Sequence, residues 1–367
     1  MHGRKREAKE VKHSSARVEA RRRKAKLYAE LSRECFARRN QKRYDEETLA
    51  LCQKLLEMNC ELYTLWNHRK EYLEPILLGS SSDAKGAAEK ELKLIEACLQ
   101  RNPKSYCCWQ HRKWVVDLAN RLPNAEEAAL DRELGLCDLL LSVDERNFHC
   151  WSYRRFVCSL HKAREPEVEL DFTTDKISQN FSNYSSWHYR SALLPEINKV
   201  TSFEDLVRGG GGENTTTTTS SSSVGVKRVL PPHVLDEEFG LVKQAFFTEP
   251  EDQSSWLYHA WLINHLVENE KKFGSYGDER VGERLEQEVE TCNEILEIEP
   301  ESKWPLLTLA RLLEAQAARA GGEGSESSAA GLHNKMRQLY RKLEGIDPMR
   351  RGYYLDAIAA VGNEEGG

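Results

Sequence analysis

Cysteine has the widest chemical range of any residue type in this sequence, since thiols bind metals, form disulfides and act as nucleophiles. The ten cysteines of the 367-residue chain lie at positions 35, 52, 60, 98, 107, 108, 137, 150, 158 and 292. No two have the Cys-x-x-Cys spacing of zinc ribbons and redox motifs. Cys52 and Cys137 each fall fourteen residues before a tryptophan of a repeated helical pattern, as small buried apolar residues would. We therefore predict reduced thiols.

A metal site was considered for Cys150, Cys158 and His161, which are spaced as neighbours on a helix. Structural zinc sites have four ligands, and no fourth ligand is apparent near these three. We therefore predict no metal site in this chain.

Cations crowd the first 26 residues, although the whole chain carries a net charge of −6. They are Arg4, Lys5, Arg6, Lys9, Lys12, Arg17, Arg21, Arg22, Arg23, Lys24 and Lys26. Such a run could mark an acidic partner. Glutamates are interspersed, however, and no aromatic residues alternate with the cations as binding of single-stranded nucleic acid requires. A solvated basic helix or arm is the simpler interpretation, and no nucleic-acid partner is predicted.

The elements that would position any site come from a pattern that returns five times, each time centred on tryptophan. The segments align without gaps: LALCQKLLEMNCELYTLWNHR (49–69), LKLIEACLQRNPKSYCCWQHR (92–112), LGLCDLLLSVDERNFHCWSYR (134–154), LDFTTDKISQNFSNYSSWHYR (170–190) and FGLVKQAFFTEPEDQSSWLYH (239–259). A shorter sixth copy contains Trp304. A degenerate seventh has Tyr354 seven residues after Asp347, where the other copies carry tryptophan.

Each copy is predicted to be a helical hairpin. Apolar residues three and four apart, such as Leu92, Ile95 and Leu99, form one face of a first helix. Turn residues such as Asn102-Pro103 follow, and a second helix carries the tryptophan. A hairpin of about 40 residues cannot bury two apolar stripes alone, but stacked hairpins bury them continuously. The predicted fold is all-α: an α-α superhelix, a right-handed crescent-shaped solenoid of about six to seven hairpins.

Two low-complexity segments interrupt the pattern. Residues 208–226, RGGGGENTTTTTSSSSVGV, contain almost no apolar side chains and predict a flexible insert, and residues 320–331, AGGEGSESSAAG, predict a second loop. The expected organisation is a basic arm or helix at 1–26, repeats at 27–207, the insert at 208–231, further repeats at 232–358 and a tail at 359–367.

Four second helices begin with Trp-x-x-Arg, and the fifth has Trp256 followed by His259 in place of arginine. The four pairs are Trp66 with Arg69, Trp109 with Arg112, Trp151 with Arg154, and Trp187 with Arg190. A residue repeated in every unit is first of all structural. We expect the indole to fill the wedge between hairpins, and the arginine to bond carbonyls or carboxylates at the end of a neighbouring hairpin.

These repeats resemble those of the protein prenyltransferase alpha subunits, which farnesyltransferase, type I geranylgeranyltransferase and Rab geranylgeranyltransferase all contain. The resemblance runs from about Leu49 to Trp304. Four strings are most similar to the Rab-modifying branch: MHGR at the start, NPKSY (102–106), VDERNFHCW (143–151) and NFSNYSSWHYRS (180–191). The alpha subunit shared by the other two enzymes would be expected to show NPKNY and YHAW.

The resemblance implies a heterodimer in which this chain wraps a beta subunit that binds zinc and geranylgeranyl diphosphate. That enzyme transfers the geranylgeranyl group to C-terminal cysteines of Rab GTPases presented by Rab escort protein. Zinc would lower the pKa of the substrate thiol while cations neutralise the departing diphosphate. This chain alone would be inactive.

The resemblance also implies site residues. Lys104 matches the family lysine that reaches the diphosphate, a task suited to a compact charge on a flexible stem. Tyr106 and His149 match positions on the same face that donate hydrogen bonds, with Asn147 adjacent to substrate. Phe148 stands where other members have tyrosine, so no hydroxyl acts there. His2 on the basic arm could reach the zinc of the beta subunit as a lid.

Other interpretations stay open at this point. Lys104 is compatible with a solvated turn lysine, and Tyr106, His149 and Asn147 are equally compatible with interface packing. The alternatives for the whole chain are the alpha subunit shared by farnesyltransferase and type I geranylgeranyltransferase, and a non-catalytic helical-repeat scaffold. The sequence has no apolar run near the ~20 residues of a membrane-spanning helix and begins with charge, so we predict a cytoplasmic location and no transmembrane segment.

Overall fold

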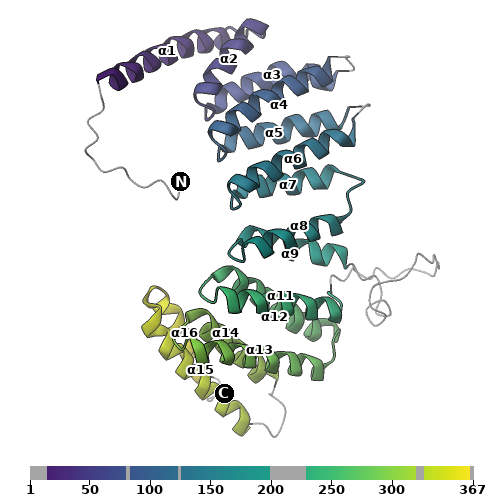
Figure 1. Ribbon diagram of the computed structural model, residues 1–367, viewed down its shortest axis with the longest axis vertical. Helices are drawn as coiled ribbons and strands as arrows, with labels where there is room; N and C mark the ends of the chain where they lie inside the picture. The colour runs from purple at the N-terminus through teal and green to yellow at the C-terminus, as the bar shows by residue number, and fades with distance from the viewer. Residues whose placement is uncertain (1–14, 80–82, 123–124, 199–228, 320–325, 364–367) are drawn as a thin grey trace, which may run out of the picture. The chain divides into compact units, whose positions relative to one another are not determined.

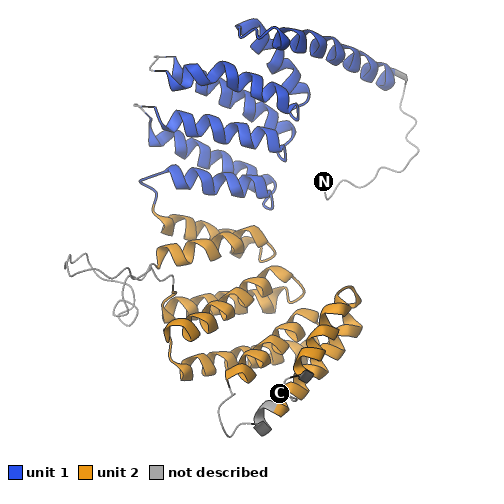
Figure 2. Ribbon diagram, turned by 180° about the vertical axis from the view of Figure 1, so that it is seen from behind, with its two compact units in different colours: residues 1–164 blue, residues 165–367 orange. Residues whose placement is uncertain are grey.

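The computed structural model describes residues 15–79, 83–122, 125–198, 229–319 and 326–363 (Figure 1). Within these ranges the regular structure is entirely helical, as predicted. The chain divides into two compact units, Met1–Arg164 and Glu165–Gly367 (Figure 2). No helix in the described ranges is long and apolar enough to cross a bilayer. His2 and the insert core at 208–226 lie outside the described residues.

The first unit contains one leading helix and three hairpins. Its helices are α1 (Ser15–Asn40), α2 (Glu46–Met58), α3 (Tyr63–Leu78), α4 (Ala84–Arg101), α5 (Tyr106–Asn120), α6 (Glu127–Val143) and α7 (Phe148–Leu160). Hairpins pair α2 with α3, α4 with α5, and α6 with α7, and they stack because α3 packs on α5 and α5 on α7. Figure 1 shows this regular order of layers.

The second unit continues the same design with four hairpins. Its helices are α8 (Pro166–Gln179), α9 (Tyr184–Ile197), α11 (Pro232–Thr248), α12 (Gln253–Phe273), α13 (Asp278–Ile298), α14 (Lys303–Arg319), α15 (Glu326–Ile346), the short 3-10 helix η1 (Pro348–Arg350) and α16 (Arg351–Asn363). Helix α9 packs directly on α12, so the repeats stay adjacent across residues 199–228. Seven hairpins in the described residues confirm the helical-repeat prediction.

The degenerate seventh repeat forms as predicted, but one loop does not. Tyr354 is buried in the tryptophan position and donates to Asp347 Oδ2 at 3.0 Å. Residues 326–331 were predicted to lie in a loop and are instead the first turns of α15. The prediction was wrong because it rested on composition. Met336 and Tyr340, further along the same helix, pack in the core, and α15 extends back from that anchor.

The repeated tryptophans anchor each hairpin in the same way. All five are at most 3% exposed, and each indole N–H donates to the backbone carbonyl six residues earlier, in the turn between the two helices, at 2.7–2.9 Å. The indole therefore fills the space under the turn and satisfies a turn carbonyl, which confirms its predicted structural role.

The arginines of Trp-x-x-Arg are buried, and Arg69, Arg112 and Arg190 reach the next hairpin. Arg154 donates to Asp138 Oδ1 of its own hairpin at 2.6 Å. Arg112 donates through Nε to Glu133 Oε2 at 2.6 Å and through Nη2 to Oε1 at 2.8 Å, and its Nη1 bonds the Leu92 carbonyl. Arg69 with Glu91 and Arg190 with Glu238 repeat this arrangement. His259, which replaces arginine in the fifth copy, contacts Glu288 at 3.0 Å. Arg69, Arg112 and Arg190 thus bond carboxylates of the next hairpin, whereas the carbonyls that they bond belong to their own hairpin.

Glu91, Glu133 and Glu238 each also bind a second residue, from the second helix of their own hairpin. Tyr153 donates its hydroxyl to Glu133 at 2.6 Å, and Tyr258 does the same to Glu238 at 2.7 Å. His111 contacts Glu91 at 2.7 Å. A carboxylate shared between consecutive hairpins couples them, because charge-assisted bonds are short and strong when buried.

This buried ladder predicts a specific acid sensitivity. Burial alone raises the pKa of Glu91, but the bonds from Arg69 and His111 outweigh it and lower the pKa to about 2. Stability that Glu91 contributes is therefore fully present above its unfolded pKa of 4.5 and is lost as the pH falls towards 2. Urea unfolding across that range should show, for Glu91→Gln, a pH slope smaller by about 1.4 kcal/mol per pH unit. An unchanged slope would contradict the assignment.

Candidate functional site

The predicted site residues gather where two successive hairpins of the first unit turn. Lys104 lies in the turn between α4 and α5, and Tyr106 begins α5. Asn147 caps α7, and His149 lies in its first turn. The Asn147 amide donates to the Pro103 carbonyl at 3.0 Å, and this carbonyl also accepts from the Trp109 indole. The repeated anchor thus fixes one turn against the other.

Asn147 is itself fully engaged in the fold. Its side-chain oxygen accepts from the backbone N–H groups of His149 and Cys150, as an N-cap residue does. The side chain is 1% exposed. It therefore positions both turns, and its role next to substrate stays a prediction.

Lys104 is an exposed cation of this edge. Its Nζ lies 3.0 Å from Asp144 Oδ2, and the two side chains are 47% and 33% exposed. An exposed pair of this kind contributes little to stability and is easily separated. Asp144 was not predicted as part of the site, although it lies in the string VDERNFHCW (143–151). The ammonium is thus held at the surface by a partner that it can leave.

Tyr106 and His149 pack together beside Lys104. Their ring centroids are 4.2 Å apart, with planes at 89°, and the Phe148 ring lies 3.9 Å from the imidazole, tilted by 32°. His149 is buried, whereas Tyr106 and Phe148 are more than half exposed. The phenol hydroxyl of Tyr106 therefore points to a surface where it can meet another molecule.

The imidazole of His149 is neutral at pH 7. Burial lowers its pKa, nearby Lys104 and Lys113 lower it further, and Glu61 opposes them. A neutral ring keeps one N–H donor and one acceptor nitrogen. The edge thus combines exposed cations, including Lys104 and Arg146, with a phenol and an imidazole whose pKa is lowered.

Exposed aromatic residues extend this edge. Tyr63, Tyr106 and Phe148 occupy the same repeat position, three residues before the tryptophan, and are 66%, 63% and 54% exposed. Large exposed aromatic side chains are characteristic of the core of protein interfaces. The aligned repeats contain this aromatic position as well as the buried tryptophan. Repetition alone did not show which of the two positions is exposed.

The buried glutamates are the residues that sequence reasoning missed. Glu91, Glu133 and Glu238 each stand eighteen residues before the repeat tryptophan. The aligned segments begin seventeen residues before the tryptophan, so these glutamates lie one position outside them. In the first copy Thr48 stands at the position of these glutamates. No aligned repeat precedes this copy, so no Trp-x-x-Arg arginine comes before Thr48.

The ten cysteines form no disulfide, and Cys52 and Cys137 are fully buried. The sulfur atoms of Cys35 and Cys52 lie 3.3 Å apart. Among the described residues no group of three or more His, Cys, Asp or Glu side chains is arranged to hold a metal ion.

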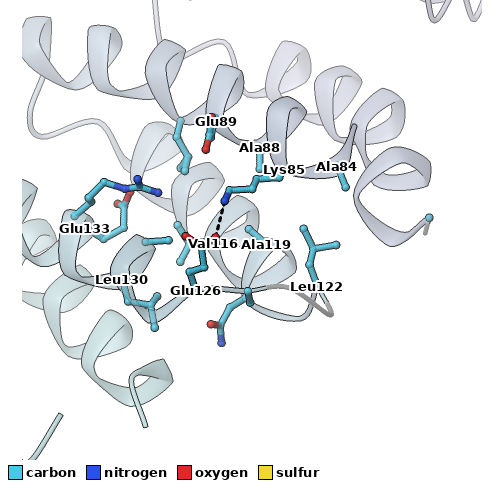
Figure 3. A pocket seen from close by; sticks show the side chains of 16 residues that line it. Ala84, Lys85, Ala88, Glu89, Val116, Ala119, Leu122, Glu126, Leu130 and Glu133 are labelled. Carbon is cyan, nitrogen blue, oxygen red and sulfur yellow. Dashed lines mark hydrogen bonds and ion pairs between the residues drawn. The ribbon is translucent and has the colours of Figure 1, made fainter. Parts of the chain in front are cut away.

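A cavity of about 520 Å³ lies between α4, α5 and α6 (Figure 3). Small apolar side chains such as Ala88 and Ala119 form its wall, and the Lys85–Glu126 ion pair, at 2.8 Å, spans it. None of the predicted site residues lines it. The predicted site lies on an exposed edge, which can contribute charge and hydrogen bonds to an adjoining molecule.

Comparisons with known proteins agree with this architecture. The family model described as "Protein prenyltransferase alpha subunit repeat" matches residues 45–74, 88–119, 130–161, 166–197 and 235–266. The first match covers the hairpin of α2 and α3, and the last covers that of α11 and α12. Each match therefore corresponds to one hairpin with its tryptophan.

Curated relatives share one name, "Geranylgeranyl transferase type-2 subunit alpha". The Rattus norvegicus relative is 41% identical over 268 residues, which cover 72% of this chain and 42% of the relative. The Schizosaccharomyces pombe relative is 29% identical over 374 residues, covering 99% of both. The chain thus spans less than half the length of the mammalian relatives.

A solved structure, "Candida albicans protein geranylgeranyltransferase-I complexed with GGPP", contains a chain that aligns with a TM-score of 0.61. The two are 19% identical, and the alignment covers 92% of this chain and 91% of the other. At that identity the likeness shows a shared fold. The five matched repeats and the curated relatives establish that this chain belongs to the protein prenyltransferase alpha subunit family.

Proposed function

We propose that this chain is the alpha subunit of a heterodimeric Rab geranylgeranyltransferase. The observation that carries the proposal is the end-to-end similarity to the Schizosaccharomyces pombe type-2 alpha subunit, supported by the higher identity to mammalian ones. The enzyme would transfer a geranylgeranyl group from geranylgeranyl diphosphate to C-terminal cysteines of Rab GTPases presented by Rab escort protein.

The proposed partner at the edge is a prenyltransferase beta subunit that holds zinc and the prenyl diphosphate. Two features support this placement. The row of Tyr63, Tyr106 and Phe148 offers exposed aromatic surface of the kind buried in protein interfaces. Lys104 and Tyr106 are also exposed at this edge, where a second subunit can meet them.

In the assembled enzyme Lys104 would leave Asp144 and approach the departing diphosphate. The transfer forms a bond between the substrate sulfur and C1 of the prenyl chain and breaks the bond from C1 to the diphosphate oxygen. Negative charge grows on that oxygen, and a nearby ammonium stabilises it. Tyr106 would donate its hydroxyl to the same group, and His149, being neutral, would contribute an N–H without a further charge.

Zinc belongs to the proposed beta subunit, where it would lower the pKa of the substrate thiol so that the thiol binds as a thiolate. This chain would contribute no ligand from its described residues, and the lid proposed for His2 concerns a residue outside them. A cytoplasmic location is proposed because ten free thiols suit a reducing compartment.

A second candidate is the alpha subunit shared by farnesyltransferase and type I geranylgeranyltransferase. The fold of the type I structure supports it at 19% identity, which is weaker support than the 29% found over the full length of a type-2 chain. A non-catalytic scaffold is the third. The three differ in what they transfer and in whether an escort protein is needed.

The test is prenyl transfer to a Rab protein by this chain co-expressed with a type-2 beta subunit, with and without Rab escort protein. The proposal expects co-purification of the two chains and transfer that depends on the escort. Escort-independent modification of a short CaaX peptide with a type I beta subunit would favour the second candidate. Failure to co-purify with either beta subunit would leave the scaffold.

A further inference from the structure

The first turns of α1 form a free-standing basic helix. All twelve residues from Ala16 to Leu27 are exposed, whereas packing begins at Tyr28, whose hydroxyl accepts from the Asn59 amide at 3.3 Å. At 1.5 Å per residue, this exposed segment projects about 18 Å beyond its contact with the hairpin. Figure 1 shows α1 extending past α2.

The charge of this segment is strongly one-sided. Its single carboxylate is Glu19, and its cations are Arg17, Arg21, Arg22, Arg23, Lys24 and Lys26. None of these cations makes an ion pair within the described part of the chain, although elsewhere in the same helix Arg38 bonds both Glu34 and Glu47. Like charges three and four residues apart destabilise a helix. An acidic partner would relieve that repulsion.

One face of the helix is free of acidic residues. Arg17, Arg21 and Lys24 follow the i, i+4, i+7 spacing that places side chains in a row, and Glu19 projects from the opposite side. No apolar stripe runs along the segment, since Val18 and Leu27 are isolated and exposed. The helix is therefore built to lie on an anionic surface and not to insert into an apolar one.

We propose that the basic helix Ala16–Leu27 docks on anionic phospholipid membranes by charge. Among polyanions, single-stranded nucleic acid is disfavoured because the segment has no aromatic residue to stack on bases. The choice of lipid over other polyanions rests on the proposed function: both a C20 prenyl diphosphate and a geranylgeranylated protein partition into bilayers. A basic helix would bring the enzyme to the surface where its substrate and product reside.

The test is co-sedimentation of the full chain, alone and with its beta subunit, with vesicles. One set is pure phosphatidylcholine, and the other contains about a third phosphatidylserine. Binding should require phosphatidylserine and should weaken on raising the salt from about 0.1 M to about 0.5 M, as screening shortens the Debye length. Equal binding to both vesicles, or no binding to either, would overturn the proposal.

A variant set locates the contact. The triple change Arg17→Gln, Arg21→Gln and Lys24→Gln keeps good helix formers and should lower the vesicle partition coefficient at least about tenfold. The matched control changes Lys54, Lys90 and Lys93, which are exposed on α2 and α4, to Gln and should alter the coefficient less than about twofold. Equal losses in the two triples would show general charge attraction and overturn the assignment to α1.

The two proposals fail separately. Transfer to a Rab protein in detergent-free solution needs no vesicle, so both triple variants should retain it. A wild-type complex that transfers but does not bind vesicles would overturn only the membrane contact. The wild-type chain could fail to bind vesicles but bind heparin, while the triple variant of α1 does not bind heparin. In that case the partner is a polyanion other than lipid.

Discussion

Glu133→Ala is expected to destabilise the first unit by about 3–5 kcal/mol, the cost of leaving a buried charge without its partner. Glu133 accepts two bonds from Arg112 and one from Tyr153. Burial lowers the pKa of Arg112, but Glu133 and Tyr153 outweigh it and raise the pKa, so the guanidinium is charged in the fold. In the variant it would retain only the Leu92 carbonyl.

Urea unfolding measures this loss. The matched control is Glu126→Ala, which removes a carboxylate of the same unit from an ion pair that is exposed on both sides and should change stability little. A Glu133→Ala variant as stable as this control would show that the ladder does not hold the repeats together.

The triple change Arg112→Met, Glu133→Leu and Tyr153→Phe separates the two contributions within the ladder. Replacing a whole buried charged group with apolar residues of similar size often restores stability. We expect the triple variant to be more stable than Glu133→Ala, because no unpaired charge remains. If it is less stable, the polar bonds themselves outweigh the cost of burying charge.

The hairpins could be predicted from the sequence because their anchors are local. Trp109 and the Pro103 carbonyl it bonds are six residues apart, within one turn. The glutamate ladder joins residues on different hairpins, 21 apart for Arg112 and Glu133 and 48 apart for Arg190 and Glu238, and only register across the alignment could reveal it. The helix at 326–331 was missed for the opposite reason: local composition indicated a loop, while buried residues later in α15 determine the structure.

The candidate site was predictable by residue but not by contact. Lys104, Tyr106 and His149 were identified from motif strings, and the structure places them on one edge. Their exposure and the pairing of Lys104 with Asp144 depend on how two hairpins meet, which no single string encodes. The same limit applies to Asn147, whose side-chain bonds cross from one turn to the next.

Lys104→Ala is expected to slow the transfer step of the assembled enzyme about 100-fold, the typical loss when one group that stabilises developing charge is removed. The effect should appear in single-turnover rates, because charge on the diphosphate oxygen grows only as the bond to C1 breaks. Binding of the beta subunit and the stability of the fold should change little, since Lys104 is half exposed and its ion pair is a surface pair.

Lys85→Ala is the matched control for this variant. Lys85 is also an exposed lysine of the first unit in an ion pair, with Glu126 at 2.8 Å, but it lies at the cavity and not on the edge formed by the turns. Its loss should leave the rate unchanged. Asp144→Asn should also preserve or raise the rate, because it frees Lys104 without removing its charge. If Lys85→Ala and Lys104→Ala behave alike, the ammonium does not act on the diphosphate, and the turn lysine is only solvated.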